Sequence, residues 1–239
     1  AYEGLLQKYA AEQKGAGQYF TPREAIRSVV RCTLPDLFRP QSAIRNPQSA
    51  IEFTIHDPAC GMAGFLIGVY EWIMSQTHEG ADLRREGREQ LQKRTFSGGE
   101  IVLETRRLAM MNLYLHEIEA EIYYGDSLAE GPHTAKRYDC VLTNPPFGTK
   151  GAGDVPVRED FTVQTSNKQL NFVQHVMHIL KSGGRAAIVL PDNVLFEDHA
   201  GRAVRRLLLT DCDLHTILRL PTGIFYAQGV KTNVLFFER

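Results

Sequence analysis

The stretch that decides the fold is Ile51-Glu-Phe-Thr-Ile-His-Asp57-Pro-Ala-Cys-Gly61-Met-Ala-Gly64-Phe65. Its first half is rich in β-branched and aromatic side chains, which is typical of a strand, and a helical pattern begins near Ala63. Gly61 and Gly64 lie in the connection, where glycine lets a ligand approach the backbone, and the first N–H groups of the helix can bind an anionic group. This order predicts a ligand site at the carboxyl end of the first strand of an open α/β sheet, although a tight turn without a ligand has the same pattern.

Strand and helix patterns alternate through the rest of the chain, which predicts a parallel sheet with helices on both faces. The strands are expected at 51–57, 95–101, 121–125, 138–143, 185–190, 214–220 and 232–238. The helices are expected at 63–74, 103–116, 168–181 and 199–209, the third ended by Gly183-Gly184. The last connection has no helical pattern, so the last strand should run antiparallel to the sixth. A seven-stranded, mostly parallel sheet with the last strand antiparallel resembles the Rossmann-like α/β fold of the class I S-adenosylmethionine-dependent methyltransferases.

Composition and charge indicate a globular protein and give no sign of a membrane protein or a metal-binding protein. The formal net charge is −1 and 43% of the residues are hydrophobic, which suits a globular protein and does not by itself indicate a nucleic-acid binder. No apolar run approaches the roughly 18 residues that cross a bilayer, so no membrane partner is expected. The four cysteines form no CxxC pair, so no metal site is expected, and reduced thiols suggest a cytoplasmic protein. Two groups of basic residues are interpreted as solvated helix faces: Arg84, Arg85, Arg88, Lys93 and Arg94, and Arg202, Arg205 and Arg206.

The two ends and two internal stretches depart from this plan. Residues 1–16, with a helical pattern over 2–13, are expected to end a preceding helical region, and 17–239 to form the catalytic domain. Both ends look cut, which predicts a longer protein in the cell. Residues 41–51 repeat Gln-Ser-Ala-Ile and are expected to be a surface insertion. The charged residues 75–94 should extend the first helix or form a loop after it.

The most specific motif is Thr143-Asn-Pro-Pro-Phe-Gly148, directly after the fourth strand. Pro145 and Pro146 fix φ and remove two donors, so the local carbonyls are rigid and free to accept. The Asn144 side-chain oxygen and the Pro145 carbonyl can together accept both N–H bonds of a planar amino group, which draws the nitrogen lone pair out of conjugation. Phe147 offers a face on which a base can stack. The predicted catalytic residues are therefore Asn144, Pro145, Pro146 and Phe147, with a structural Pro-Pro turn as the alternative.

Two acidic residues end the second and third strands. Glu100 can accept hydrogen bonds from both ribose hydroxyls of a nucleoside, and Asp126 can accept one from the amine of its adenine. Glu100 follows Gly61 by 39 positions instead of the usual ~20, a surplus that the charged insertion explains. The alternatives are an exposed strand-end glutamate and a turn or N-cap aspartate. The glycine turn does not match GxGxxG, so the methionine end of S-adenosylmethionine fits it better than a dinucleotide.

In their order along the chain, Gly17-Gln-Tyr-Phe-Thr-Pro-Arg23, Asp57-Pro-Ala-Cys-Gly61 and Asn144-Pro-Pro-Phe147 resemble the N6-adenine DNA methyltransferases. More narrowly, they resemble the modification (M) subunits of type I restriction–modification systems. The resemblance implies transfer of a methyl group from S-adenosylmethionine to N6 of adenine in DNA. It assigns to the cofactor site Phe20, Thr21, Asp57, Ala59, Gly61, Gly64, Phe65, Glu100 and Asp126. The chain departs from the family at Met62-Ala63, where Ser or Thr followed by Gly is usual.

The resemblance also implies partners: double-stranded DNA, a specificity (S) subunit with which two M chains assemble, and a restriction (R) subunit. The target adenine would be extruded from the duplex, since its N6 is out of reach when paired and stacked. The alternatives are methylation of a protein glutamine or an RNA base, and a non-catalytic cofactor-binding subunit. Phe147 favours DNA, because the protein-glutamine enzymes resemble one another in having Tyr there. Residues 149–166, with Lys150 and Arg158, should form either a mobile loop that closes on DNA or cofactor, or a surface loop without a role.

Overall fold

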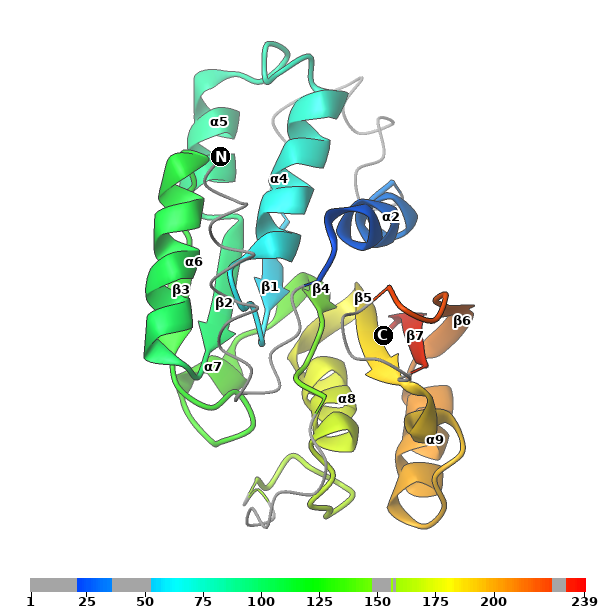
Figure 1. Cartoon of the computed structure of the whole chain (residues 1–239). Coiled ribbons are helices and arrows are strands. Elements are labelled where there is room, and N and C mark those ends of the chain that lie inside the picture. Colours follow the sequence, from blue (N-terminus) through cyan, green and yellow to red (C-terminus); the bar gives the residue numbers. More distant parts are fainter. Residues whose placement is uncertain (1–20, 36–52, 148–155, 157, 225–230) are drawn as a thin grey trace.

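The computed structural model describes residues 21–35, 53–147, 156, 158–224 and 231–239, in which strands and helices alternate from the first strand onward (Figure 1). The strands are β1 (Ile55–Asp57), β2 (Phe96–Glu100), β3 (Glu121–Tyr124), β4 (Tyr138–Thr143), β5 (Leu180–Pro191), β6 (Asp213–Arg219) and β7 (Thr232–Glu238). The helices are α2 (Arg23–Thr33), α4 (Gly64–Gln76), α5 (Arg85–Lys93), α6 (Leu103–Leu115), α7 (Pro132–Ala135), α8 (Lys168–Ile179), α9 (Ala200–Asp211) and the short 3-10 helix η2 (Asp192–Leu195).

The strands form one sheet in the order β3-β2-β1-β4-β5-β7-β6. Neighbouring strands are parallel except at β7, which is antiparallel to both β5 and β6. Asn233 of β7 pairs with Leu190 on one side and with Arg219 on the other. The predicted seven strands and the reversed last strand are confirmed. The strand order changes direction between β1 and β4, which is the place where open α/β sheets bind ligands.

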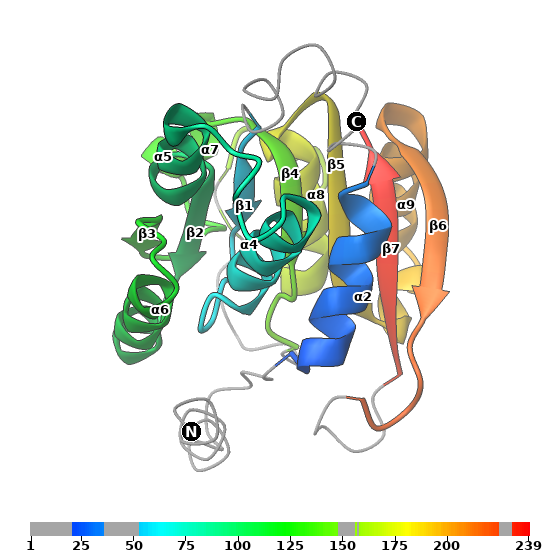
Figure 2. The same cartoon turned by 90° about the horizontal axis from the view of Figure 1, so that it is seen from above.

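Helices cover both faces of the sheet (Figure 2). On one face, α4 packs over β1 and β4, α2 packs over β5, and the two helices pack against each other. Their buried side chains, such as Ile26 and Leu66, belong to one core cluster. On the other face, α8 packs over β5 and α9 over β6, and the two helices contact each other, with Val173 and Leu208 in a second core cluster. The central strands β1, β4 and β5 are thus covered on both faces, which explains the burial of β1 along its length and the apolar run at 186–190 of β5.

Several local predictions differ from the structure. Residues 85–93 form the separate helix α5 instead of an extension of α4 or a loop. The helix α8 ends at Ile179, because Leu180 already pairs with Tyr138 at the start of β4. Gly183, with φ +74°, therefore lies inside β5, where the register against β4 shifts, and does not end the helix. The helices α2 and α7 were not predicted.

Some predictions concern residues whose structure is not described. The helical pattern at 2–13, the repeat at 41–51, Phe20 and Lys150 all lie outside the described residues. Within the ranges that the structure does describe, no helix combines the length and the apolar character needed to span a bilayer.

Candidate active site

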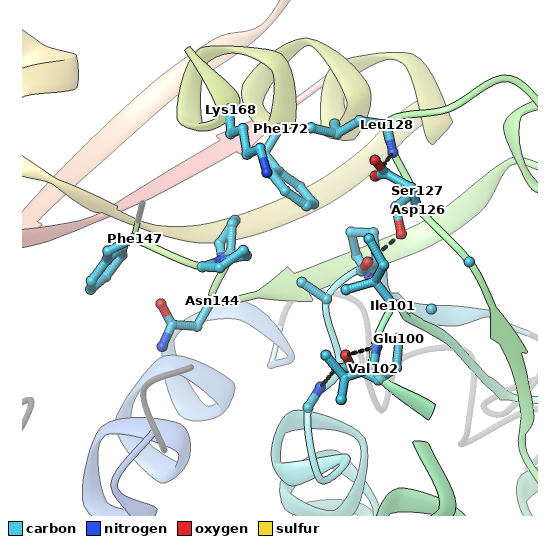
Figure 3. A pocket seen from close by; sticks show the side chains of 17 residues that line it. Glu100, Ile101, Val102, Asp126, Ser127, Leu128, Asn144, Phe147, Lys168 and Phe172 are labelled. Atoms are coloured by element: carbon cyan, nitrogen blue, oxygen red, sulfur yellow. Dashed lines mark hydrogen bonds between the residues drawn. The ribbon is translucent and has the colours of Figure 1, made fainter. Parts of the chain in front are cut away.

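A pocket of about 270 Å³ opens at the carboxyl ends of β1 to β4 (Figure 3). This volume is close to the ~300 Å³ lower end of small-molecule sites. The walls include Ala59 and Gly61 after β1, residues 100–102 at and after the end of β2, 126–128 after β3, 144–147 after β4, and Lys168 and Phe172 from α8. The pocket therefore lies at the change of strand order, where the sequence predicted a ligand site.

Glu100 holds the glycine turn beside the pocket. One carboxylate oxygen accepts a hydrogen bond of 3.1 Å from the N–H of Gly61, and the other accepts one of 2.8 Å from the N–H of Val102. Gly61 has φ +54°, a left-handed conformation that favours glycine. Burial of the Glu100 side chain raises its pKa, and the backbone donors oppose that rise. Glu100 thus connects the ends of β1 and β2 and lines the pocket between them.

The residues that open α4 turn away from the pocket. Ala63 precedes the helix with φ 64° and ψ 27°, a left-handed conformation that is strained for a residue with a Cβ. Gly64 and Gly68 face α2, since a Cβ at these positions would lie 2.8 and 2.4 Å from atoms of Ile26. Phe65 is buried in the core. Of the residues assigned to the cofactor site, Gly64 and Phe65 therefore do not line this pocket. The departure at Ala63 falls where the backbone favours glycine.

Asp57 is buried at the end of β1. Its Oδ1 accepts a hydrogen bond of 3.0 Å from the N–H of Ala59, a residue that lines the pocket. Burial raises the pKa of Asp57 to about 7, and the Glu100 carboxylate adds to the rise against the opposing hydrogen bonds. Asp57 does not line the pocket itself; its contact with Ala59 shapes the turn that does.

Asp126 opens the turn after β3 and lines the pocket. Its Oδ1 accepts a hydrogen bond of 2.9 Å from the N–H of Leu128. Asp126 therefore stabilises the turn, which is the alternative role that the sequence indicated. The neighbouring Ser127 is buried. Its hydroxyl donates to the carbonyl of Pro58 and is hydrogen-bonded to the hydroxyl of Tyr123 at 2.6 Å. Ser127 therefore links the turns that follow β1 and β3.

Asn144, at the end of β4, pairs with a residue just before α2. Its Nδ2 donates a hydrogen bond of 2.9 Å to the hydroxyl oxygen of Thr21. Its Oδ1 is buried and has no hydrogen-bond partner among the described residues. A buried acceptor without a donor costs roughly 1–3 kcal/mol, so this atom is suited to accept a hydrogen bond from a ligand. Thr21, which was assigned to the cofactor site, contacts the predicted catalytic loop (Asn144 to Phe147) instead of lining the pocket.

The remaining residues of the predicted catalytic loop continue along the rim of the pocket (Figure 3). The carbonyl of Pro146 accepts a hydrogen bond of 3.3 Å from Nε2 of Gln169 in α8. Phe147 is partly buried against the core cluster that contains β1 and α4. The structure thus brings to one pocket Ala59, Gly61, Glu100, Asp126, Asn144, Pro145, Pro146 and Phe147.

Sequence reasoning missed the parts of the wall that α8 and Ile101, directly after β2, provide. Lys168 and Phe172, four residues apart on α8, project toward the loop that holds Asn144 (Figure 3). Ile101, next to Glu100, is 54% exposed and leaves an apolar side chain at the pocket. The spacing of Lys168 and Phe172 places them on one helix face, but nothing in the sequence shows that this face meets the pocket.

The segment after the catalytic loop also differs from expectation where it is described. Arg158 and Phe161 are 2% and 4% exposed. Arg158 forms a bidentate ion pair with Asp160 and lies with its guanidinium carbon 4.2 Å from the centre of the Phe161 ring. The expected surface loop is therefore packed into the protein at Arg158 and Phe161.

Comparison with known proteins agrees with this geometry. The model of the N-6 DNA Methylase family matches residues 1–239. The chain is 48% identical over 245 residues to the methylase subunit of the type I restriction enzyme StySPI from Salmonella potsdam, and 48% identical over 246 residues to that of EcoKI from Escherichia coli K12. Each match covers 100% of this chain but 43% of the relative, so the chain spans less than half the length of these relatives.

Solved structures give the same result. The M protein of the type I restriction enzyme EcoKI superimposes with a TM-score of 0.80 at 45% identity, covering 93% of this chain and 44% of the other. The methyltransferase subunit of a type I restriction-modification system from Streptococcus thermophilus gives 0.72 at 27% identity, covering 100% and 48%. The fold is therefore the methyltransferase fold that the sequence predicted, and the resemblance to type I modification subunits is confirmed. Because its model matches the entire chain, this protein belongs to the N-6 DNA methylase family.

Proposed function

We propose that this chain carries the methyl-transfer site of a type I modification subunit and methylates N6 of adenine in double-stranded DNA, with S-adenosylmethionine as the methyl donor. The observation that carries the proposal is the buried Oδ1 of Asn144, which has no hydrogen-bond partner in the part of the chain that the structure describes and lies in an Asn-Pro-Pro-Phe loop at the rim of a pocket. An amino group is the kind of donor that such an acceptor requires.

The pocket suits the cofactor. Glu100 presents a buried carboxylate for the ribose hydroxyls, and the left-handed turn at Gly61 permits close approach to the backbone. Ile101 and Phe172 offer apolar surface for the adenine ring, and Asp126 an acceptor for its amine. S-adenosylmethionine, when bound, supplies a methyl carbon activated by a sulfonium. Positioning of the amine against that carbon needs no paired acid and base.

The catalytic loop prepares the amine. Asn144 Oδ1 and the Pro145 carbonyl accept its two N–H bonds and draw the lone pair out of conjugation, so the nitrogen becomes nucleophilic. The two prolines hold both acceptors at fixed positions, because their φ angles cannot adjust. Phe147 stacks against the extruded base, a contact worth roughly 1–3 kcal/mol. These roles concern the chain's own residues and require only that an adenine reach the rim of the pocket.

The partners follow from the relatives. The similar proteins are named as methylase subunits of type I restriction enzymes, and one similar solved structure is titled for complex assembly of a type I system. We infer that the complete protein acts with a specificity subunit, which selects the DNA site, and with a restriction subunit. The net charge of −1 is compatible with DNA contacts that a partner shares.

The test is transfer of labelled methyl groups by the complete protein with its partner subunits to double-stranded DNA, an RNA duplex and a glutamine-containing peptide. We expect label in N6-methyladenine from DNA, and label in RNA or peptide alone would overturn the proposal. Asn144→Ala should lower the rate about 100-fold or more while the affinity for S-adenosylhomocysteine changes less than about threefold, because the lost acceptor serves only the amine. Gln76→Ala, an exposed amide at the far end of α4, is the matched control and should keep wild-type activity. Equal loss of binding and transfer in Asn144→Ala would contradict its role.

A further inference from the structure

Arg158 is buried beside the turn after β3, which forms part of the pocket wall. Only 2% of the residue is exposed. Its Nε donates a hydrogen bond of 2.8 Å to Asp160, and Nη2 donates to the second oxygen of the same carboxylate. Its Nη1 is 3.2 Å from the carbonyl oxygen of Ser127 and 2.9 Å from Nδ1 of His175. A buried guanidinium is strongly destabilising unless it is paired and hydrogen-bonded, so such a set of partners makes Arg158 costly to displace.

His175 is a fixed acceptor in this set. Because Nη1 of Arg158 can only donate, Nδ1 of His175 must be unprotonated, and the ring is neutral with its proton on Nε2. Burial, together with the nearby guanidinium, holds the pKa of His175 well below its usual value. His175 belongs to α8, so this bond attaches Arg158 to the helix that supplies Lys168 and Phe172 to the pocket.

Ser127 is the other end of the connection. Its carbonyl accepts from Arg158, and its hydroxyl donates to the carbonyl of Pro58. Both Ser127 and Pro58 line the pocket, and the preceding Asp126 does so as well. The guanidinium therefore contacts the backbone of the pocket wall directly.

The segment that carries Arg158 is also held along its length. Gln174 of α8 accepts a hydrogen bond from the N–H of Val163 and donates one to the carbonyl of the same residue, both 2.9 Å long. Asn171 donates a bond of 2.8 Å to the carbonyl of Thr165. Residues 158–165 are thus attached to α8, and through Arg158 to the turn after β3.

We propose that Arg158 is a positioning residue for the cofactor. It fixes the backbone of Ser127 to residues 158–165, and thereby holds the neighbouring Asp126 in its place at the pocket. The proposal rests on the proposed function, because it assigns the pocket to S-adenosylmethionine. Loss of Arg158 frees the turn after β3 and weakens cofactor binding, while the binding of DNA to other surfaces is unaffected.

The test measures steady-state kinetics of the complete protein with its partner subunits. Arg158→Met should raise KM for S-adenosylmethionine about tenfold with KM for DNA within about twofold, and Arg158→Lys should restore part of the loss. Arg205→Met is the matched control, since Arg205 of α9 also donates to two backbone carbonyls, those of Val194 and Glu197, and none of these three residues lines the pocket. It should leave both KM values unchanged. Loss of activity only in proportion to the folded fraction, or an unchanged KM for the cofactor, would overturn the proposal.

Hydrogen exchange of the wild-type protein tests the positioning role of Arg158 even if the variants fail to fold. Binding of S-adenosylhomocysteine should slow exchange at residues 158–165 together with 126–128, because Arg158 joins them. Slower exchange at 126–128 alone would overturn the proposal. A wild-type protein that binds no S-adenosylhomocysteine would instead contradict the proposed function, which separates the two failures.

Discussion

The side-chain amide of Asn144 donates a hydrogen bond of 2.9 Å to the hydroxyl of Thr21, although 123 positions separate the two residues in the sequence. The bond uses the donor end of the amide and leaves the buried Oδ1 without a partner among the described residues. Thr21 therefore decides which end of the amide is available to a substrate. A residue just before α2 thus orients the acceptor that the predicted catalytic loop presents.

Replacing Thr21 with Val should lower kcat about tenfold, since Asn144 loses the acceptor that orients its amide and a neutral hydrogen bond contributes roughly 0.5–1.5 kcal/mol. KM for the cofactor should change little, because Thr21 does not line the pocket. The measurement is methyl transfer to DNA at saturating cofactor. Thr21→Ser keeps the hydroxyl and should retain most of the activity; equal loss in both variants would contradict an orienting role.

Replacing Glu100 with Gln should weaken binding of S-adenosylhomocysteine about tenfold or more. The carboxylate accepts from Gly61 and Val102 at once, and an amide has only one accepting oxygen. Titration calorimetry measures the affinity. Glu104→Gln, an exposed glutamate in the first turn of α6, is the matched control. Unchanged affinity in Glu100→Gln would exclude Glu100 from the cofactor site.

Replacing Ala63 with Gly should stabilise the protein by about 1 kcal/mol, because Ala63 has φ 64° and its Cβ is strained there. Urea denaturation measures the free energy of unfolding. Ala203→Gly, inside α9, should have the opposite sign and destabilise by roughly 0.5–1 kcal/mol, since glycine is unfavourable within a helix. A destabilising Ala63→Gly would show that packing of the methyl group outweighs the backbone strain.

Asp57 should make the stability depend on pH. Its pKa in the folded chain is about 7, above the ~3.9 of an unfolded aspartate. The folded state thus keeps a proton that the unfolded state loses, and this contribution to stability declines as the pH rises from about 4 to about 7.

The variant Asp57→Asn should remove that decline, because the amide cannot ionise and still accepts from the N–H of Ala59. Urea denaturation at pH 5 and pH 7.5 gives the free energy of unfolding at each pH. The change between the two pH values should be smaller in the variant than in the wild type, by on the order of 2 kcal/mol. Asp213→Asn, an exposed aspartate of β6, should keep the wild-type difference. Equal pH dependence in Asp57→Asn and the wild type would show that Asp57 is ionised in the folded state.

Local patterns were sufficient for the presence of seven strands and for the direction of the last one, although β5 begins at Leu180 and not at the predicted residue 185. The limits of β4 and β7 were predicted to the residue, because alternation and turn residues act over a few positions. The reversal of β7 followed from chain connectivity, since a parallel crossover needs a helix that residues 221–231 do not encode. The catalytic motif was equally local, as its prolines fix the backbone wherever the loop lies.

The sequence by itself determined the strands of the sheet, the direction of the last strand and the family, whereas the tertiary structure decided which side chains meet. Neither the pairing of Asn144 with Thr21 nor the burial of Arg158 against Ser127 has a local pattern, because each joins elements that come together only when helices pack on the sheet. Gly64 looked like part of a ligand turn but faces Ile26, since its role depends on how closely α2 approaches α4. Backbone conformation follows from neighbours in sequence, while burial and hydrogen-bond partners follow from neighbours in space.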